Sequence, residues 1–243
     1  MATSIAMLRA SGAALPEYVA GHSLGEYCAM YAAGVMNLED TLKSIQKRAE
    51  LMNEVKNGKM AAILKAPEEL LKAGIEEGLK VGYVDVANYN SPQQVVITGD
   101  DNAVEAVCNY ISKDDKVRVV PLAVSGAFHS KYVEDGAKKF EEYIKSTQLN
   151  DAEIPVITNV DAEITVKSND FREKMPRQMY SSVHWTETIR KMANEGVDTF
   201  IEIGPGKVLT GLNKKIIPDA KIYSVSDKDS LEYLISELTC IVK

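Results

Sequence analysis

The chain has 243 residues, of which 45% are hydrophobic, so it can bury one large core, or one core together with a small satellite domain. A net charge of -7 argues against nucleic acid as a partner, because nucleic-acid binders carry a basic surplus. No apolar run approaches the roughly 20 residues of a membrane helix, and the N-terminus lacks the pattern of a signal peptide, so we expect a cytoplasmic protein without membrane attachment.

The first expected elements are helices with one short strand between them. They cover residues 3–11 (helix), 18–20 (strand), 26–33 (helix) and 38–55 (helix). A tight turn at residues 21–25 joins the strand to the second helix, and Gly34 ends that helix. Arg48 borders the predicted buried face of the last helix. That face consists of apolar residues at helical spacing: Leu42, Ile45, Ala49 and Met52.

Residues 59–123 have a pattern of their own. Strands are expected at residues 60–64, 83–87, 94–98 and 117–123, and helices at residues 67–79 and 101–112. This β-α-β-β-α-β order is the split βαβ arrangement of a ferredoxin-like domain. We therefore assign residues 58–124 to a ferredoxin-like small subdomain.

After residue 126 strands and helices alternate again. Helices are expected at 131–146, 185–194 and 208–216, and strands at 154–159 and 199–203. Alternation of this kind implies a mostly parallel sheet. The predicted fold class is therefore α/β, with the small subdomain inserted into a larger, discontinuous domain of residues 1–57 and 125–243.

The turn Gly21-His22-Ser23-Leu24-Gly25 fits the pattern G-x-S-x-G between a strand and a helix. In such a turn, side chains at the glycine positions would collide with neighbouring backbone, and the serine hydroxyl is exposed at the helix N-terminus. There the helix dipole and free N–H groups favour a developing oxyanion. The context makes Ser23 a candidate nucleophile, and the alternative is a chance match.

A serine nucleophile needs a base, and the sequence offers three histidines. His129 follows the last strand of the small subdomain and precedes a helix, but its position alone also suits an ordinary surface or core residue. His184 is interpreted as a packing or helix-capping residue, and the side chain of His22 starts off in a different direction from Ser23. The histidines and cysteines lack the spacing of a zinc site or a disulfide framework, so we expect no metal and no cofactor.

Arg48 is the third residue that bears on function. Together with Lys47 it forms a pair of cations on a predicted helix, and periodicity alone favours a solvated helix face. The functional alternative is a guanidinium fork that binds a substrate carboxylate.

The order of these motifs resembles that in the malonyl-CoA:acyl carrier protein transacylase family, over essentially the whole chain. The segments that carry the resemblance are residues 21–27 (GHSLGEY), 46–52 around Arg48, 88–94 (NYNSPQQ), 127–130 (AFHS) and 202–209 (EIGPGKVL). The resemblance implies an α/β-hydrolase-like core with a ferredoxin-like insert, which agrees with the elements expected from the residues.

The resemblance also implies roles for individual residues. Ser23 would be the nucleophile and His129 the base, and Gln178 would orient His129 through its backbone carbonyl. Arg48 would hold the malonyl carboxylate, and the Leu24 N–H would supply half of the oxyanion hole. The other residues implied to bind substrate are Asn88 and Asn90 in the cleft, Phe128, which suits malonyl over methylmalonyl, and His22.

Members of this family carry a Gly-Gln-Gly-Ser-Gln loop upstream of the nucleophile turn, and the Gln N–H there supplies the other half of the oxyanion hole. This sequence shows no such loop before Ser23, so we expect a chain that is short of one core strand and one donor. Loss of one such donor typically lowers the rate roughly a hundred- to a thousandfold.

The leading hypothesis is an acyltransferase of fatty acid biosynthesis, acting as a monomer. It would move a malonyl group from malonyl-CoA to the phosphopantetheine thiol of acyl carrier protein through an ester on Ser23. Two alternatives remain open at this point. One is a serine hydrolase or thioesterase, and the other is a truncated, non-catalytic fragment that binds a partner.

Overall fold

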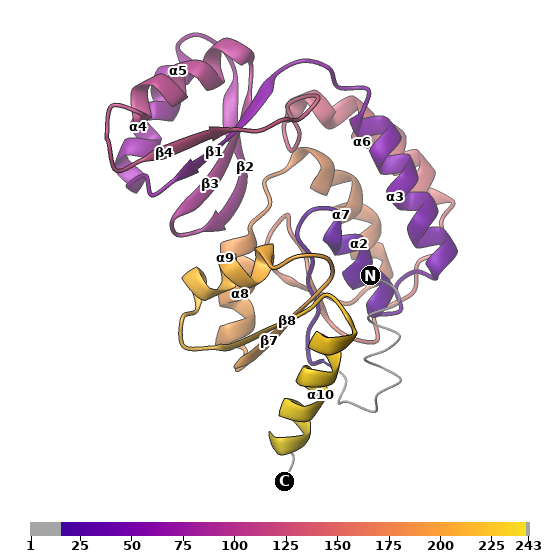
Figure 1. Ribbon diagram of the computed structural model, residues 1–243. Helices are drawn as coiled ribbons and strands as arrows, with labels where there is room; N and C mark the ends of the chain where they lie inside the picture. The colour runs from indigo at the N-terminus through magenta and orange to yellow at the C-terminus, as the bar shows by residue number, and fades with distance from the viewer. Residues whose placement is uncertain (1–15, 242–243) are drawn as a thin grey trace.

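A computed structural model describes residues 16–241, and the helix expected at residues 3–11 lies outside them. The fold is mixed α/β, as the alternation of elements predicted. Figure 1 shows a small sheet with two helices at one end of the molecule, and the remaining helices and strands grouped beside and below it. Within residues 16–241 no helix is both long and apolar enough to cross a membrane.

Two helices follow the nucleophile turn, α2 (Gly25–Ala32) and α3 (Leu38–Met52). The predicted inner face of α3 is right for Met52, which is buried, but wrong for Leu42, which is 56% exposed whereas Arg48 is only 5% exposed. A partly polar stripe is buried instead, and it consists of Thr41, Ser44, Arg48, Leu51 and Met52. Helical spacing alone cannot choose between two adjacent stripes. The choice follows from packing, since α3 lies against α2 and α6 with this stripe inward.

The segment from residue 59 to residue 121 forms a four-stranded antiparallel sheet with two helices. Its elements in chain order are β1 (Lys59–Leu64), α4 (Glu68–Leu79), β2 (Val84–Ser91), β3 (Gln94–Gly99), α5 (Asp101–Ile111) and β4 (Arg118–Pro121). The strands lie in the order β2-β3-β1-β4. The β-α-β-β-α-β succession expected from the sequence is present, and all three strand pairings are antiparallel.

The continuous apolar run of β1 is explained by the burial of both faces of this sheet. Ile63 points to the face covered by α4 and α5, where it packs in one cluster with Ile111. Met60 and Ala62 alternate with it and point to the opposite face, where they pack against Phe128. The second face of the small sheet therefore contacts the segment that carries His129.

The remaining elements follow residue 126. They are, in chain order, the 3-10 helix η1 (Lys131–Val133), α6 (Glu134–Lys145), β5 (Val156–Ile157), β6 (Ile164–Thr165), α7 (Ser168–Tyr180), α8 (Trp185–Asn194), β7 (Thr199–Ile203), α9 (Val208–Ile216), β8 (Lys221–Val225) and α10 (Lys228–Ile241). The main apolar cluster lies between α2, α3, α6 and α7.

The prediction of a mostly parallel sheet does not describe how these strands pair. The sheet with the most strands among residues 16–241 is the antiparallel one. Parallel pairing of named strands is found between β7 and β8. The expected strand at residues 18–20 contributes an isolated parallel bridge between Val19 and Val156. Alternation along the sequence indicates that strands and helices exist, but strand partners are chosen by tertiary packing.

Candidate active site

Ser23 lies in a tight turn at the start of α2, and its φ of 50° is in the left-handed region that is uncommon for residues with side chains. Gly21 is required in this turn, because a Cβ on it would lie 2.0 Å from the carbonyl carbon of Gly25. A Cβ on Gly25 would meet no atom within 4 Å. The predicted crowding therefore explains the first glycine of the motif and not the second.

His129 contacts the nucleophile directly. Its Nε2 lies 2.8 Å from Ser23 Oγ, and its Nδ1 faces two backbone carbonyls, Gln178 O at 3.0 Å and Ser181 O at 3.1 Å. Carbonyl oxygens only accept hydrogen bonds, so Nδ1 must carry the proton and Nε2 must accept from the serine hydroxyl. Burial, followed by the charges of Arg48 and His22, lowers the pKa of His129 to about 3. The imidazole is therefore neutral at physiological pH, and its Nε2 lone pair faces the serine hydroxyl.

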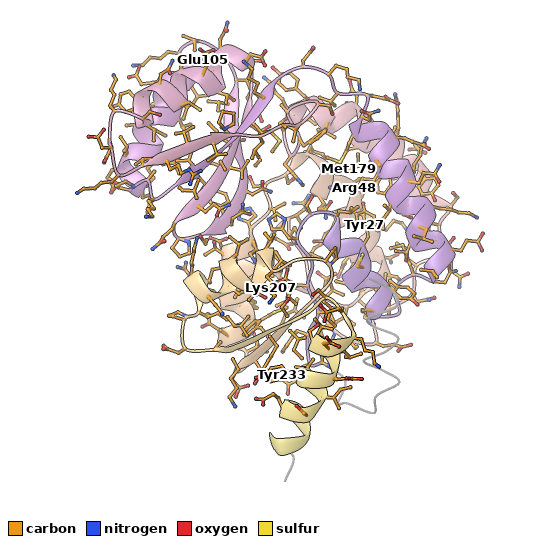
Figure 2. All side chains as sticks on the ribbon, in the orientation of Figure 1. Tyr27, Arg48, Glu105, Met179, Lys207 and Tyr233 are labelled. Atoms are coloured by element: carbon orange, nitrogen blue, oxygen red, sulfur yellow. The ribbon has the colours of Figure 1, made fainter. Side chains whose placement is uncertain are left out.

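Arg48 reaches the same hydroxyl from α3. Its Nη2 donates to Ser23 Oγ at 3.1 Å, and its guanidinium lies over the ring of Tyr27, 5.7 Å from the centroid. Its Nε has no hydrogen-bond partner among the residues that the structure describes. Figure 2 shows Tyr27, Arg48 and Met179 gathered where α2, α3 and α7 meet. The solvated-face interpretation of Arg48 is wrong, because this guanidinium is buried beside Ser23.

Gln178 forms hydrogen bonds with both His129 and Ser23. Besides the carbonyl that accepts from His129, its side-chain Nε2 donates to Ser23 O at 2.7 Å. The N–H of Leu24, by contrast, is taken by no acceptor within residues 16–241. Leu24 is the N-cap residue of α2, where N–H groups have no partner inside the helix. Its N–H is therefore available to a developing oxyanion.

The other expected binding residues surround this centre. His22 Nε2 donates to Asn90 Oδ1 at 2.6 Å, and its ring meets that of Trp185 edge-on at 5.6 Å. Burial, partly offset by the bond to Asn90, lowers the pKa of His22. Asn88 and Asn90 are both buried in β2. The resemblance implied that Asn88 and Asn90 line a cleft, and the structure joins Asn90 directly to His22.

Phe128 and His184 both make packing contacts with neighbouring side chains. Phe128 packs against the main apolar cluster and also against the small sheet, so it joins the two regions next to His129. His184 stacks on Tyr89 with ring centroids 5.3 Å apart and precedes α8 without capping it through its side chain. Of the two roles expected for His184, the structure therefore shows packing and not side-chain helix capping.

Two buried residues of the site were missed by sequence reasoning. Asn159 accepts a hydrogen bond from Ser23 N at 2.7 Å through Oδ1 and donates to Gly21 O at 2.8 Å through Nδ2. Glu26 accepts from Asn159 N at 2.5 Å, and burial is the main cause that raises its pKa to about 8. The available signal was a polar residue at the end of the strand expected at residues 154–159 and a carboxyl inside the G-x-S-x-G-E segment. Across the described residues no group of His, Cys, Asp and Glu is arranged to hold a metal ion.

A family model described as an acyl transferase domain matches residues 1–227, which is most of the chain. The chain belongs to the acyl transferase family. This acyl transferase is 42% identical to the malonyl CoA-acyl carrier protein transacylase of Bacillus subtilis over 245 residues, covering 98% of this chain and 77% of the relative. It is 40% identical to the protein of that name from Synechocystis, covering 90% of this chain and 73% of the relative.

Solved structures agree with this membership. The acyl transferase matches malonyl CoA-acyl carrier protein transacylase from Clostridium perfringens with a TM-score of 0.93 at 35% identity, covering 99% of this chain and 76% of the other. It matches a malonyl-transacylase solved in complex with its type II polyketide acyl-carrier protein with a TM-score of 0.93 at 33% identity, covering 97% of this chain and 77% of the other.

Proposed function

We propose that this acyl transferase moves a malonyl group from malonyl-CoA to the phosphopantetheine thiol of acyl carrier protein. The observation that carries the proposal is the three-way contact at Ser23 Oγ, where His129 Nε2 lies at 2.8 Å and Arg48 Nη2 at 3.1 Å. A base and a cation at one hydroxyl suit an acyl group that ends in a carboxylate. The names of the relatives support the same reaction.

In the first half-reaction Ser23 Oγ attacks the thioester carbonyl carbon and its proton passes to His129 Nε2. The tetrahedral oxyanion is stabilised by the Leu24 N–H at the start of α2. As the intermediate collapses, the C–S bond breaks and the CoA sulfur takes the proton from Nε2. The products are coenzyme A and a malonyl ester on Ser23.

The second half-reaction runs the same steps in reverse with a different thiol. The phosphopantetheine sulfur of acyl carrier protein gives its proton to His129 Nε2 and attacks the ester carbonyl. The C–O bond then breaks, and Ser23 Oγ recovers the proton. The carbonyl groups of Gln178 and Ser181 keep Nδ1 protonated throughout, so His129 serves without a carboxylate partner.

Arg48 selects malonyl in this proposal. In a malonyl ester the free carboxylate lies only two bonds beyond the carbonyl carbon, so a cation that binds it must lie beside the nucleophile. Arg48 meets this requirement from α3, and its partnerless Nε leaves a donor for the carboxylate. The reaction would supply malonyl groups to fatty acid biosynthesis in the cytoplasm.

The finer architecture belongs to the same proposal. Residues 1–57 and 125–243 form an α/β-hydrolase-like catalytic domain, to which the parallel pair β7–β8 and the Val19–Val156 bridge belong. Residues 58–124 form a ferredoxin-like subdomain, supported by the strand order β2-β3-β1-β4 and by an apolar cluster of its own. The packing of Phe128 against both regions supports an insert that lies against the site.

Incubation with radiolabelled malonyl-CoA tests the function. The proposal expects a label on Ser23, transfer of that label to acyl carrier protein with its phosphopantetheine arm, and no label on a Ser23→Ala variant. Release of free malonate without transfer would favour the hydrolase alternative. A chain that gives neither label nor malonate would be a binding fragment, and an adduct on Ser23→Ala would remove the assignment of the nucleophile.

A further inference from the structure

A buried amide holds the Ser23 turn from behind. Asn159, which has no exposed surface, lies two residues after the end of β5. Its side chain accepts from the N–H of Ser23 and donates to the carbonyl of Gly21, so one amide joins two points of the same turn. Neither atom is shared with the reacting hydroxyl.

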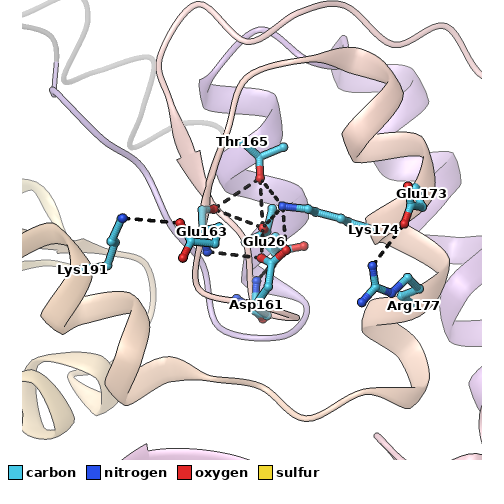
Figure 3. Close-up of polar contacts among 10 residues, drawn as sticks. Glu26, Asp161, Glu163, Thr165, Glu173, Lys174, Arg177 and Lys191 are labelled. Carbon is cyan, nitrogen blue, oxygen red and sulfur yellow. Dashed lines mark hydrogen bonds and ion pairs between the residues drawn. The ribbon is translucent and has the colours of Figure 1, made fainter.

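The backbone of Asn159 is held as well, and its carbonyl accepts from the His184 N–H at 3.0 Å. The backbone N–H of Asn159 donates to Glu26 in the first turn of α2, a carboxyl that is 1% exposed. Figure 3 shows Lys174 reaching from α7 to Thr165 and Asp161 beside Glu26, and the ion pair between Lys174 and Asp161 measures 2.8 Å. The backbone of Asn159 is therefore fixed beside α2, and from there its side-chain amide reaches the Ser23 turn.

The bond to Asn159 also decides which backbone donor faces the substrate. The Ser23 carbonyl is held by Gln178 and the Ser23 N–H by Asn159, so both polar backbone groups of this strained residue are occupied. The next donor along the chain, the Leu24 N–H, is then the one left for the oxyanion.

We propose that Asn159 is a positioning residue for the nucleophile, because its amide fixes Ser23 in the left-handed conformation that aims Oγ at His129 and turns the Ser23 N–H away from the substrate. Asn159 touches no reacting atom and acts through the backbone of the turn. The inference rests on the proposed role of Ser23 as the nucleophile, and it adds a residue to which no role had been assigned.

A serine-directed fluorophosphonate reagent tests the inference, because its rate of labelling reports the reactivity of Ser23 without any acyl donor. Asn159→Leu removes both bonds at similar volume and should slow labelling about a hundredfold, the loss typical of a reacting group displaced by about 1 Å. The matched control is Thr158→Val, which removes buried hydrogen bonds one residue away without touching the turn. It should lower stability and leave the labelling rate unchanged.

Asn159→Asp adds a pH readout that a structural role would not produce. A protonated carboxyl offers one acceptor and one donor, as the amide does, whereas an ionised carboxylate offers Gly21 O no donor. The labelling rate of this variant relative to wild type should therefore rise as the pH falls from about 8 to about 5, and the ratio for Asn159→Leu should stay flat. The titratable or charged groups around the position are Glu26, Arg48, His22, His129, Asp161 and Lys174. The flat ratio of Asn159→Leu is the control for their own titration.

Wild-type labelling of folded Asn159→Leu would overturn the inference. If that variant does not fold, a flat ratio for folded Asn159→Asp overturns it instead. Labelling of Ser23→Ala at the wild-type rate is a different outcome, because it would remove the proposed function and this inference with it.

Discussion

The interior behind Ser23 and the interior of the four-stranded sheet are both buried, but they are built from opposite chemistry. Between that sheet and α4 and α5 the cluster is entirely apolar, with Ile111, Val107 and Ile97 fully buried. Behind Ser23 the buried side chains include Arg48 and Asn159, which bond to the nucleophile from separate segments. The first region can be packed by volume alone, whereas the second must match donors to acceptors.

The polar region bears a cost that the cluster between the sheet and α4 and α5 avoids. Tyr27 Oη, Arg48 Nε and Gln178 Oε1 are buried without a hydrogen-bond partner among the residues described. Thr98 Oγ1 in β3 is also buried without a partner among the residues described, but Thr98 is not part of that cluster. Buried polar groups are normally paired, and exceptions concentrate where function requires them. The comparison predicts that changes in the polar region alter chemistry first, and that changes in the apolar cluster between the small sheet and α4 and α5 alter stability alone.

The largest expected effect is the loss of the base. His129→Ala removes the proton acceptor at Ser23 Oγ and should lower the rate of acyl-enzyme formation about 10²- to 10⁴-fold. His184→Ala, which removes a ring stacked on Tyr89, should change mainly stability. Single-turnover acylation kinetics on both variants check the ranking, and the reverse order would mean that the wrong histidine was chosen.

A substitution in the apolar cluster between the small sheet and α4 and α5 should have the opposite effect, on stability and not on rate. Ile111→Ala removes a fully buried side chain from the apolar cluster and should lower the free energy of unfolding by about 2 to 4 kcal/mol. The acylation rate below the melting temperature should remain that of wild type. Urea unfolding and acylation assays measure the two quantities, and a comparable loss of rate would show that the two regions are coupled.

Specificity is the next effect in size. Arg48→Ala should lower malonyl transfer about a hundredfold relative to acetyl transfer, because charge-assisted hydrogen bonds to a carboxylate contribute ~1.5–3 kcal/mol each. A competition assay between malonyl-CoA and acetyl-CoA measures the ratio. Equal losses with both donors would leave Arg48 a role at Ser23 Oγ but none in selecting the acyl group.

The smallest effect concerns Glu26, whose pKa is raised from its ordinary value of 4.5 to about 8, chiefly by burial. The folded state then holds this proton more tightly than the unfolded state, so the stabilisation is complete below pH 4.5 and is lost as the pH rises through 8. Between these values wild type should lose about 1 kcal/mol of unfolding free energy per pH unit relative to Glu26→Gln. Denaturant unfolding at several pH values checks this, and parallel pH profiles would contradict it.

More of the site was predicted from the sequence than the local patterns alone would allow, because the family resemblance added residues. The strand–turn–helix context singled out Ser23, and the family resemblance added His129, Arg48 and Gln178, all of which the structure brings into contact with the nucleophile residue. Their roles in the reaction stay predictions. Asn159 was missed because no motif marks it. It lies 136 residues after Ser23 in the chain, so only folding brings it to the turn.

Elements whose signals are local could be predicted from the sequence. The succession of strands and helices between residues 59 and 121 follows from apolar runs and periodicity within a few residues. Packing between distant segments determines which stripe of α3 is buried, which strands pair, and which nitrogen of His129 carries the proton. Each of these depends on a partner distant in sequence: α2 and α6 for Arg48, β3 and β4 for β1, and the carbonyls of Gln178 and Ser181 for the imidazole. Periodicity reports the spacing of side chains along one segment, and it carries no information about the atoms that a folded chain places opposite them.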